Sequence, residues 1–176
     1  MDQARQNARC IYTRDEVNNA IQQMADEINQ HPTLPASQPV VICVMNGGLV
    51  LTGQILPLLN FPLQLDYLHA TRYQGAQEGG ELHWINKPQT SLKGRAVLLL
   101  DDIMEQGITL ARVIDYCKEQ EASAVYCGIL LKKKLQQRQC EIEIDFTGLE
   151  IDDYYVFGFG MDLDHYWRNA DGIYAI

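Results

Sequence analysis

The sequence predicts an α/β fold in which helices flank a mostly parallel, twisted sheet. Two short apolar runs, 39–45, which is rich in β-branched residues, and 97–100, are typical of strands that are covered on both faces. A helical pattern over 110–119 and a further apolar run over 125–131 follow the second run. Residues 97–131 therefore form a strand–helix–strand unit, and such units join parallel strands.

The other elements follow from hydrophobic spacing and from glycine and proline. Residues 14–30 carry apolar side chains at helical spacing and are predicted to form a helix that ends before Pro32. A second helix is expected over 49–58 and a second strand over 63–68. Residues 69–90 combine three glycines with polar and aromatic residues, which indicates a long loop or an extended β-arm.

Composition limits the classes of protein that this chain can represent. Its 176 residues, 47% hydrophobic and 21% charged, suit a single domain over 1–176 with a real core. No apolar run is long enough to span a membrane, and the N-terminus does not resemble a signal peptide. The net charge of −9 argues against general nucleic-acid binding. Five dispersed cysteines without a CxxC pair indicate free thiols, so we expect a cytoplasmic protein.

The most informative stretch runs from Val97 to Leu110. A buried strand ends with two adjacent carboxylates, Asp101 and Asp102, at the sheet edge where open α/β folds bind ligands. A turn containing Gly107 and Thr109 then leads into a helix, whose first N–H groups can hold a phosphate. Carboxylates beside a phosphate repel it unless a cation or hydroxyl groups intervene. The stretch therefore predicts a sugar phosphate accompanied by Mg²⁺.

The same stretch is compatible with two other interpretations. Taken alone, Asp101 and Asp102 are compatible with a pair that merely ends a strand and caps the next helix. With Glu105, the pair also resembles the acidic magnesium motif of prenyl synthases, but those proteins are all-helical and longer. The strand–helix–strand context favours the sugar-phosphate interpretation over both.

Residues 97–110 resemble the phosphoribosyl-diphosphate (PRPP) signature of type I phosphoribosyltransferases. Over about 130 residues, from the strand at 40 to Arg168, the chain is similar to the hypoxanthine-guanine branch of that family. The resemblance implies the family's fold, with a small hood formed by a mobile arm, here about 69–90, and the C-terminal segment. It also implies that Asp101, Asp102 and Glu105 are the catalytic carboxylates. The first two would bind the ribose hydroxyls, and Glu105 would handle the proton at purine N7, where the branch commonly has aspartate.

The resemblance further assigns residues to the phosphates of PRPP. Glu105, Gln106, Gly107, Ile108 and Thr109 would form the loop that binds the 5′-phosphate. A second set would bind the diphosphate: Met45, Asn46, Gly47, Arg72, Tyr73 and Arg168. Family members often have lysine where Asn46 stands, and a cis peptide bond, here expected between Met45 and Asn46. Arg72 departs from the usual serine, and its charge is a candidate to replace that of the missing lysine.

A purine site and a metal site are also implied. Lys132 matches the lysine that contacts the six-position oxygen in this branch, and an ammonium, which only donates hydrogen bonds, favours a 6-oxo purine. Tyr155 and Val156 would stack on the base and bind its edge, and Asp162 would lie near the base and a second Mg²⁺. Mg²⁺ ligands are thus expected among Asp101, Asp102 and Asp162. Considered alone, Lys132 is more often a residue of a solvated lysine run, and Tyr155 more often one of the core or an interface.

Some polar residues are expected to lie outside the site. Asp152 and Asp153 are predicted to occupy a solvated turn. His69, His83 and His165 have no metal-ligand spacing and are expected on the surface or in the arm.

The sequence thus predicts a purine-salvage enzyme that converts hypoxanthine or guanine and PRPP to IMP or GMP and diphosphate, with Mg²⁺ as cofactor. Two alternatives stay open: a transferase of the same type for another base, such as xanthine, adenine or a pyrimidine, and a PRPP-sensing regulator of the same fold. The expected partners are small molecules and copies of the chain itself, as a dimer or tetramer, with no nucleic acid and no membrane.

Overall fold

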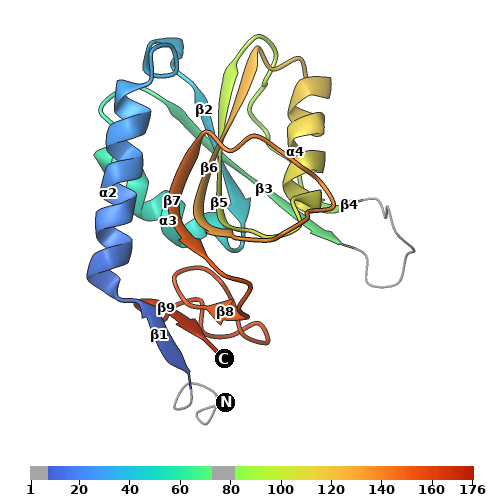
Figure 1. Cartoon of the computed structure of the whole chain (residues 1–176). Helices are drawn as coiled ribbons and strands as arrows, with labels where there is room; N and C mark the ends of the chain where they lie inside the picture. The colour runs from blue at the N-terminus through green and yellow to red at the C-terminus, as the bar shows by residue number, and fades with distance from the viewer. Residues whose placement is uncertain (1–7, 73–81) are drawn as a thin grey trace.

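A six-stranded sheet forms the centre of the protein in the computed structural model, which describes residues 8–72 and 82–176 (Figure 1). The strand order is β4-β3-β2-β5-β6-β7, and every neighbouring pair is parallel except β3 and β4. The strands are β2 (Val40–Met45), β3 (Gln64–Arg72), β4 (Leu82–Asn86), β5 (Ala96–Met104), β6 (Ala124–Lys133) and β7 (Phe146–Ile151). The predicted fold class is confirmed.

Helices cover both faces of this sheet and separate its core into two layers. Helices α2 (Arg14–Gln30) and α3 (Gly48–Ile55) pack on one face, and α4 (Ile108–Glu119) packs on the other (Figure 1). Short 3₁₀ turns, η1 (Pro35–Ser37) and η2 (Leu56–Leu58), follow α2 and α3. Because both faces are covered, β2 and the first half of β5 are apolar on both sides, which explains their continuous hydrophobic runs.

Helix α2 matches the predicted helix over 14–30. Thr13 caps it with a reciprocal box, because its hydroxyl accepts from the Glu16 amide while the Glu16 carboxylate accepts from the Thr13 amide. Its buried side chains recur at helical spacing and form one stripe: Val17, Ala20, Ile21, Met24, Ala25 and Ile28.

A second, smaller sheet joins the two ends of the described chain. In it β9 (Ile173–Ala175) pairs with β1 (Arg9–Tyr12) on one side and β8 (Val156–Phe157) on the other, all antiparallel. This sheet, which we call the hood, lies beyond the end of β7 (Figure 1). The sequence indicated a hood from the arm and the C-terminal segment but did not indicate the contribution of β1.

Strand lengths differ from the sequence prediction in two places that affect the site. The strand predicted over 97–100 continues to Met104, because its pairing with β6 extends to Met104 and Lys132. Asp101 and Asp102 therefore lie within the last half of β5 rather than after it. The strand predicted over 63–68 likewise continues to Arg72 and pairs with β4, so the described part of 69–90 is a β-arm.

None of the helices in the described ranges has the length and apolar character needed to cross a membrane.

Two glycines of α3 make a matched test of how closely this helix packs on the strand that carries the acid pair. A Cβ at Gly48 would lie 2.4 Å from the carbonyl oxygen of Leu100, whereas a Cβ at Gly53 would meet nothing within 4 Å. We expect Gly48→Ala to lower the free energy of unfolding by about 1–3 kcal/mol through overpacking. Gly53→Ala should raise it by about 0.5–1 kcal/mol, because alanine favours the helix.

Urea unfolding followed by circular dichroism measures both changes. A Gly48→Ala variant as stable as Gly53→Ala would contradict the close approach of α3 to β5.

Candidate active site

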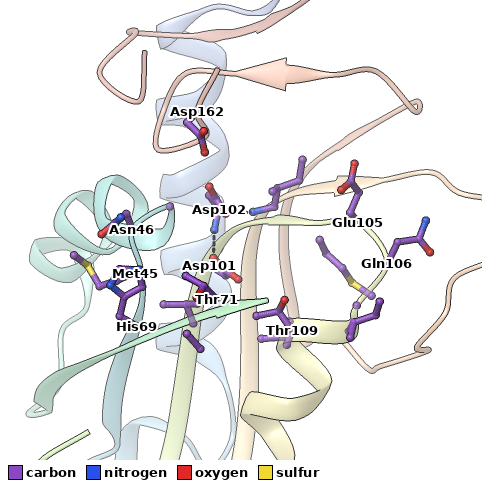
Figure 2. Close-up of a pocket in the computed structure, with 18 of the residues that line it drawn as sticks. Met45, Asn46, His69, Thr71, Asp101, Asp102, Glu105, Gln106, Thr109 and Asp162 are labelled. Carbon is purple, nitrogen blue, oxygen red and sulfur yellow. Dashed lines mark hydrogen bonds between the residues drawn. The ribbon is translucent and has the colours of Figure 1, made fainter. Parts of the chain in front are cut away.

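The carboxyl ends of parallel strands meet at one edge of the central sheet and enclose a cavity of about 560 Å³. This volume is in the range of sites for small molecules. The lining includes Met45–Gly47, Asp101–Thr109, Asp162 and Arg168, which come from β2, β5, the start of α4 and the segment after β8. The structure thus brings together residues that the sequence predicted for the ribose and both phosphate groups (Figure 2).

Asp101 and Asp102, the acid pair, lie side by side in this cavity. The Asp102 amide donates to Asp101 Oδ1 at 2.9 Å, and the Ile103 amide donates to Asp102 Oδ1 at 2.8 Å. Burial raises the pKa of Asp101 well above its usual range, and the charge of Asp102 raises it further. Burial also raises the pKa of Asp102, although the Ile103 amide and the Arg168 charge oppose this. Ionising this pair is therefore costly without a nearby cation or hydroxyl groups.

The loop after β5 and the start of α4, together residues 105–109, form the second wall of the cavity. Gly107 has a φ of 75°, in the left-handed region that glycine enters easily, and α4 begins at the next residue. The segment around Cys140 packs on this loop: the Cys140 amide donates to the Gln106 carbonyl at 3.0 Å. A Cβ at Gly107 would lie 2.4 Å from the Cys140 carbonyl. The loop is thus held with the N-terminus of α4 toward the cavity, as a phosphate requires.

The end of β2 supplies the third wall. The peptide bond between Met45 and Asn46 is cis, as the resemblance implied. Gly47 follows and lies so close to the acid pair that a Cβ there would be 1.9 Å from Asp102 Oδ2. Helix α3 begins at Gly48, so a second helix N-terminus faces this side of the cavity. Any side chain at position 47 would displace the Asp102 carboxylate.

The described part of the arm, residues 69–72 and 82–90, lines the cavity with four residues that were not predicted to bind a ligand: His69, Ala70, Thr71 and Ile85. Arg72, expected at the diphosphate, is the last residue of β3, and its side chain, like the whole of Tyr73, lies outside the described part of the chain. His69 of β3 pairs in register with Met45 and lines the cavity, although it was expected on the surface or in the arm. Its position follows from the length of β3, which hydrophobic pattern alone did not predict.

The loop after β8 closes the cavity from the hood side. Arg168 donates to the Gly160 carbonyl and to Asp162 Oδ1, each at 2.6 Å, and the His165 amide donates to Asp162 Oδ2 at 2.9 Å. Gly160 touches the opposite wall, because a Cβ there would lie 2.2 Å from the Gly47 carbonyl. Asp162 points from this loop toward Asp102 (Figure 2). Arg168 thus contacts Asp162, and its charge acts on Asp102, two of the three carboxylates expected to hold a metal.

A smaller cavity of about 130 Å³ adjoins the first and shares Asp102, Ile103, Glu105 and Asp162 with it. Tyr155, Val156 and Met161, which lie in or near β8 of the hood, also line it. The Tyr155 side chain is 53% exposed, whereas Val156 is buried. An exposed ring at the mouth of a cavity is available to stack on a planar ligand, as predicted for Tyr155.

The lysine in this cavity is Lys133, and the expectation that Lys132 would occupy it is corrected. Lys133 lines the cavity and its side chain is only 5% exposed, whereas Lys132 is not part of the lining. Successive residues of a strand point to opposite faces, so two neighbouring lysines of β6 cannot both face one cavity. Nothing in a run of three lysines indicates which of them points inward.

Two carboxylates hold the ammonium of Lys133. It donates to Glu105 Oε1 and, at 3.2 Å, to Asp153 Oδ1. Burial lowers the pKa of Lys133, but the hydrogen bonds and charges of Glu105 and Asp153 outweigh it, so this pKa lies above its usual value. The lysine is thus a charged donor inside the smaller cavity. Asp152 and Asp153 are both exposed, as expected for a solvated turn, and Asp153 in addition contacts Lys133, which spacing could not indicate.

The residues at the junction of the two cavities fit a magnesium ion that arrives with a phosphorylated ligand. Mg²⁺ is usually held by one or two carboxylates together with phosphate oxygens and waters. Asp101 and Asp102 provide two adjacent carboxylates whose burial favours such a cation, and Asp162 faces them across the cavity. Among the described residues, no three His, Cys, Asp or Glu side chains are close enough to hold a metal by themselves.

The family model for the phosphoribosyl transferase domain matches residues 11–165. The hypoxanthine-guanine-xanthine phosphoribosyltransferase of Tritrichomonas foetus is 26% identical over 161 residues, 92% of this chain and 87% of that protein. The hypoxanthine-guanine phosphoribosyltransferase of Bacillus subtilis (strain 168) is 25% identical over 160 residues, 90% of this chain and 87% of that protein. A solved structure of such an enzyme from Bacillus anthracis has a TM-score of 0.87 at 20% identity, covering 96% of this chain and 98% of that one. That likeness shows a shared fold.

Buried, ionised carboxylates should lower the stability of the folded protein when no cation is bound to them. Because burial raises the pKa of Asp101 in the folded state, the folded protein binds protons more readily than the unfolded chain. This effect is lost as the pH rises through the folded-state pKa, so ionised Asp101 lowers stability at pH 7. We expect Asp101→Asn, without divalent cations, to melt at a higher temperature than the wild type at pH 7.

The gain should shrink as the pH falls toward about 4, the usual pKa of aspartate. Asp115→Asn, on the exposed face of α4, is the control and should change the melting temperature little. Thermal unfolding at several pH values measures this. A lower melting temperature for Asp101→Asn at pH 7 would contradict the account of the buried pair.

Proposed function

The chain belongs to the phosphoribosyl transferase domain family, and we propose that it transfers the phosphoribosyl group of PRPP to N9 of hypoxanthine or guanine, releasing diphosphate. The observation that carries this proposal is the arrangement of two joined cavities. The larger has an acid pair between two helix N-termini, and the smaller has a lysine donor beside an exposed tyrosine. One fits a pentose with phosphates at both ends, and the other fits a 6-oxo purine. We also propose that residues 1–176 work as a single domain.

In the larger cavity, the chain's own residues would hold the two ends of PRPP. The N–H groups at 106–109 and the Thr109 hydroxyl bind the 5′-phosphate, aided by the dipole of α4. The backbone of Met45, Asn46 and Gly47, with Arg168, holds the diphosphate. Asp101 and Asp102 accept hydrogen bonds from the ribose hydroxyls between these ends. The sugar is thereby fixed while its bond to the leaving diphosphate breaks.

Magnesium bound by Asp101, Asp102 and the diphosphate, with Asp162 at a second position, would supply the charge compensation for the leaving group. The chain provides few cations here: of the described residues that line the cavity, Arg168 alone is a lysine or arginine. With Asn46 in place of the lysine common in the family, this cavity depends heavily on its cation.

In the smaller cavity, Lys133 donates to the six-position oxygen and Tyr155 stacks on the ring. The Val156 backbone binds the edge of the base. Glu105 accepts the proton at N7 as the bond to N9 forms. Adenine has an amino group at the six position, which cannot accept a hydrogen bond from an ammonium that only donates. The site therefore favours 6-oxo purines.

We further propose that the enzyme is a cytoplasmic homo-oligomer. All five cysteines are free thiols, as is usual in reducing compartments. Leu65 and Tyr67, two residues apart on β3, are 54% and 47% exposed, and Leu49 of α3 is 54% exposed. Such apolar side chains support an interface between copies of the chain.

A panel of purines tests the proposed reaction directly. The purified protein is assayed with PRPP, Mg²⁺ and, in turn, hypoxanthine, guanine, xanthine and adenine, with nucleotide formation followed by absorbance. We expect turnover with hypoxanthine or guanine, none with adenine, and loss of activity when EDTA removes the cation. Turnover of adenine alone, or of no purine, would refute the proposal.

The acid pair has a specific expected effect on rate. Asp102→Asn should lower kcat by about 10²–10³-fold, because it removes a charge that acts on the reacting sugar and its cation. Steady-state kinetics with saturating hypoxanthine and PRPP measures this. An unchanged kcat would remove Asp102 from the mechanism.

The neighbouring lysines of β6 provide a matched pair for the base site. Lys133→Met should raise KM for hypoxanthine by about tenfold or more, since it removes a charged hydrogen bond worth about 1.5–3 kcal/mol. Lys132→Met should leave KM within about twofold, because Lys132 does not line the cavity. The reverse order of effects would restore the role to Lys132.

A further inference from the structure

The ammonium of Lys133 lies between two carboxylates from different parts of the chain. Glu105 follows β5, and Asp153 follows β7. The lysine side chain is 5% exposed, while those of Glu105 and Asp153 are 48% and 65% exposed. Ion pairs between exposed groups contribute little, but a buried ammonium needs a partner to remain charged. Glu105 and Asp153 therefore stabilise the charged form of Lys133, although both carboxylates are partly exposed.

The proposed reaction gives Glu105 a second task. Its carboxylate must accept the proton of purine N7, and a carboxylate engaged with a purine has less capacity for Lys133. At the same moment Lys133 must keep its charge and its place to donate to the six-position oxygen. Of the two carboxylates that contact this lysine, only Asp153 has no part in the chemistry.

Other charged groups around the lysine do not take over this role. Arg138 donates to the carbonyl oxygens of Glu105 and Lys133, so it fixes the backbone of both residues and adds positive charge. Lys134 pairs with Glu150 at 3.4 Å on the outside of the strand. Asp152 is exposed and adjacent to Asp153, but it is not among the carboxylates that contact the lysine in the described structure.

We propose that Asp153 is a positioning residue that holds the Lys133 ammonium in the base cavity while Glu105 engages the purine, and that it thereby sets the preference for 6-oxo over 6-amino purines. This inference rests on the proposed function. Asp153 does not touch the substrate. It acts through the lysine, so its loss affects recognition of the base rather than breakage of the bond to diphosphate.

Asp153→Asn and Asp152→Asn form a matched pair, since each replaces one exposed carboxylate of the same turn by an amide. We expect Asp153→Asn to raise KM for hypoxanthine by about tenfold, which corresponds to about 1.4 kcal/mol of lost binding. KM for PRPP and kcat should change by less than about twofold, because the ribose and phosphate contacts remain. The ratio of kcat/KM for hypoxanthine to that for adenine should fall. Asp152→Asn should match the wild type in all four quantities.

Two further measurements separate positioning from folding. Melting temperatures of both variants show whether the turn stays intact, and Asp153→Glu, which keeps the charge, should recover most of the lost affinity. Equal kinetics for Asp153→Asn and Asp152→Asn would overturn the inference while leaving the proposed function standing. A fall in kcat and a rise in KM for PRPP, each as large as the rise in KM for hypoxanthine, would also overturn it. A wild type that used no purine would instead refute the proposed function.

Discussion

The burial of two adjacent carboxylates at the end of β5 is the constraint on which the rest of the site depends. Burial disfavours the ionised forms of Asp101 and Asp102. The residues around them leave open space next to the two carboxylates. Position 47 requires glycine, because a Cβ there would collide with the Asp102 carboxylate. Gly160, in the loop after β8, likewise approaches the Gly47 carbonyl closely. In the proposed function, a cation and the hydroxyl groups of a sugar would compensate the charge of these carboxylates. The buried acid pair thus lowers the stability of the folded protein at the residues that the proposed binding and catalysis would use.

The smaller cavity also contains a buried charge, but this charge is positive. The buried ammonium of Lys133 is stabilised there by Glu105 and Asp153. It therefore remains a charged hydrogen-bond donor inside the cavity. Strands β5 and β6 are parallel neighbours, and their ends bring the acid pair and the lysine to the same edge of the sheet. The topology therefore places the two cavities side by side, and Tyr155, next to β8 of the hood, lines the smaller one.

Local chemistry predicted much of this from sequence, and tertiary pairing limited the rest. The acid pair and the Gly107 turn were identifiable because a buried strand, two carboxylates and a helix start follow one another within fourteen residues. By contrast, strand ends depend on partners: β5 and β3 extend beyond their apolar runs because β6 and β4 pair with them, and this placed His69 in the cavity. The choice between Lys132 and Lys133 depends on the direction of a side chain in β6, which a run of identical residues conceals. The contact of Asp153 joins segments twenty residues apart and has no local signature.

A crystal structure with inosine 5′-monophosphate, diphosphate and Mg²⁺ would test the central claim most directly. The account predicts the 5′-phosphate on the N–H groups at 106–109, the ribose hydroxyls on Asp101 and Asp102, and the six-position oxygen on Lys133. It also predicts Mg²⁺ between the acid pair and the diphosphate. A nucleotide bound away from the end of β5, or one whose ribose makes no contact with either aspartate, would contradict it.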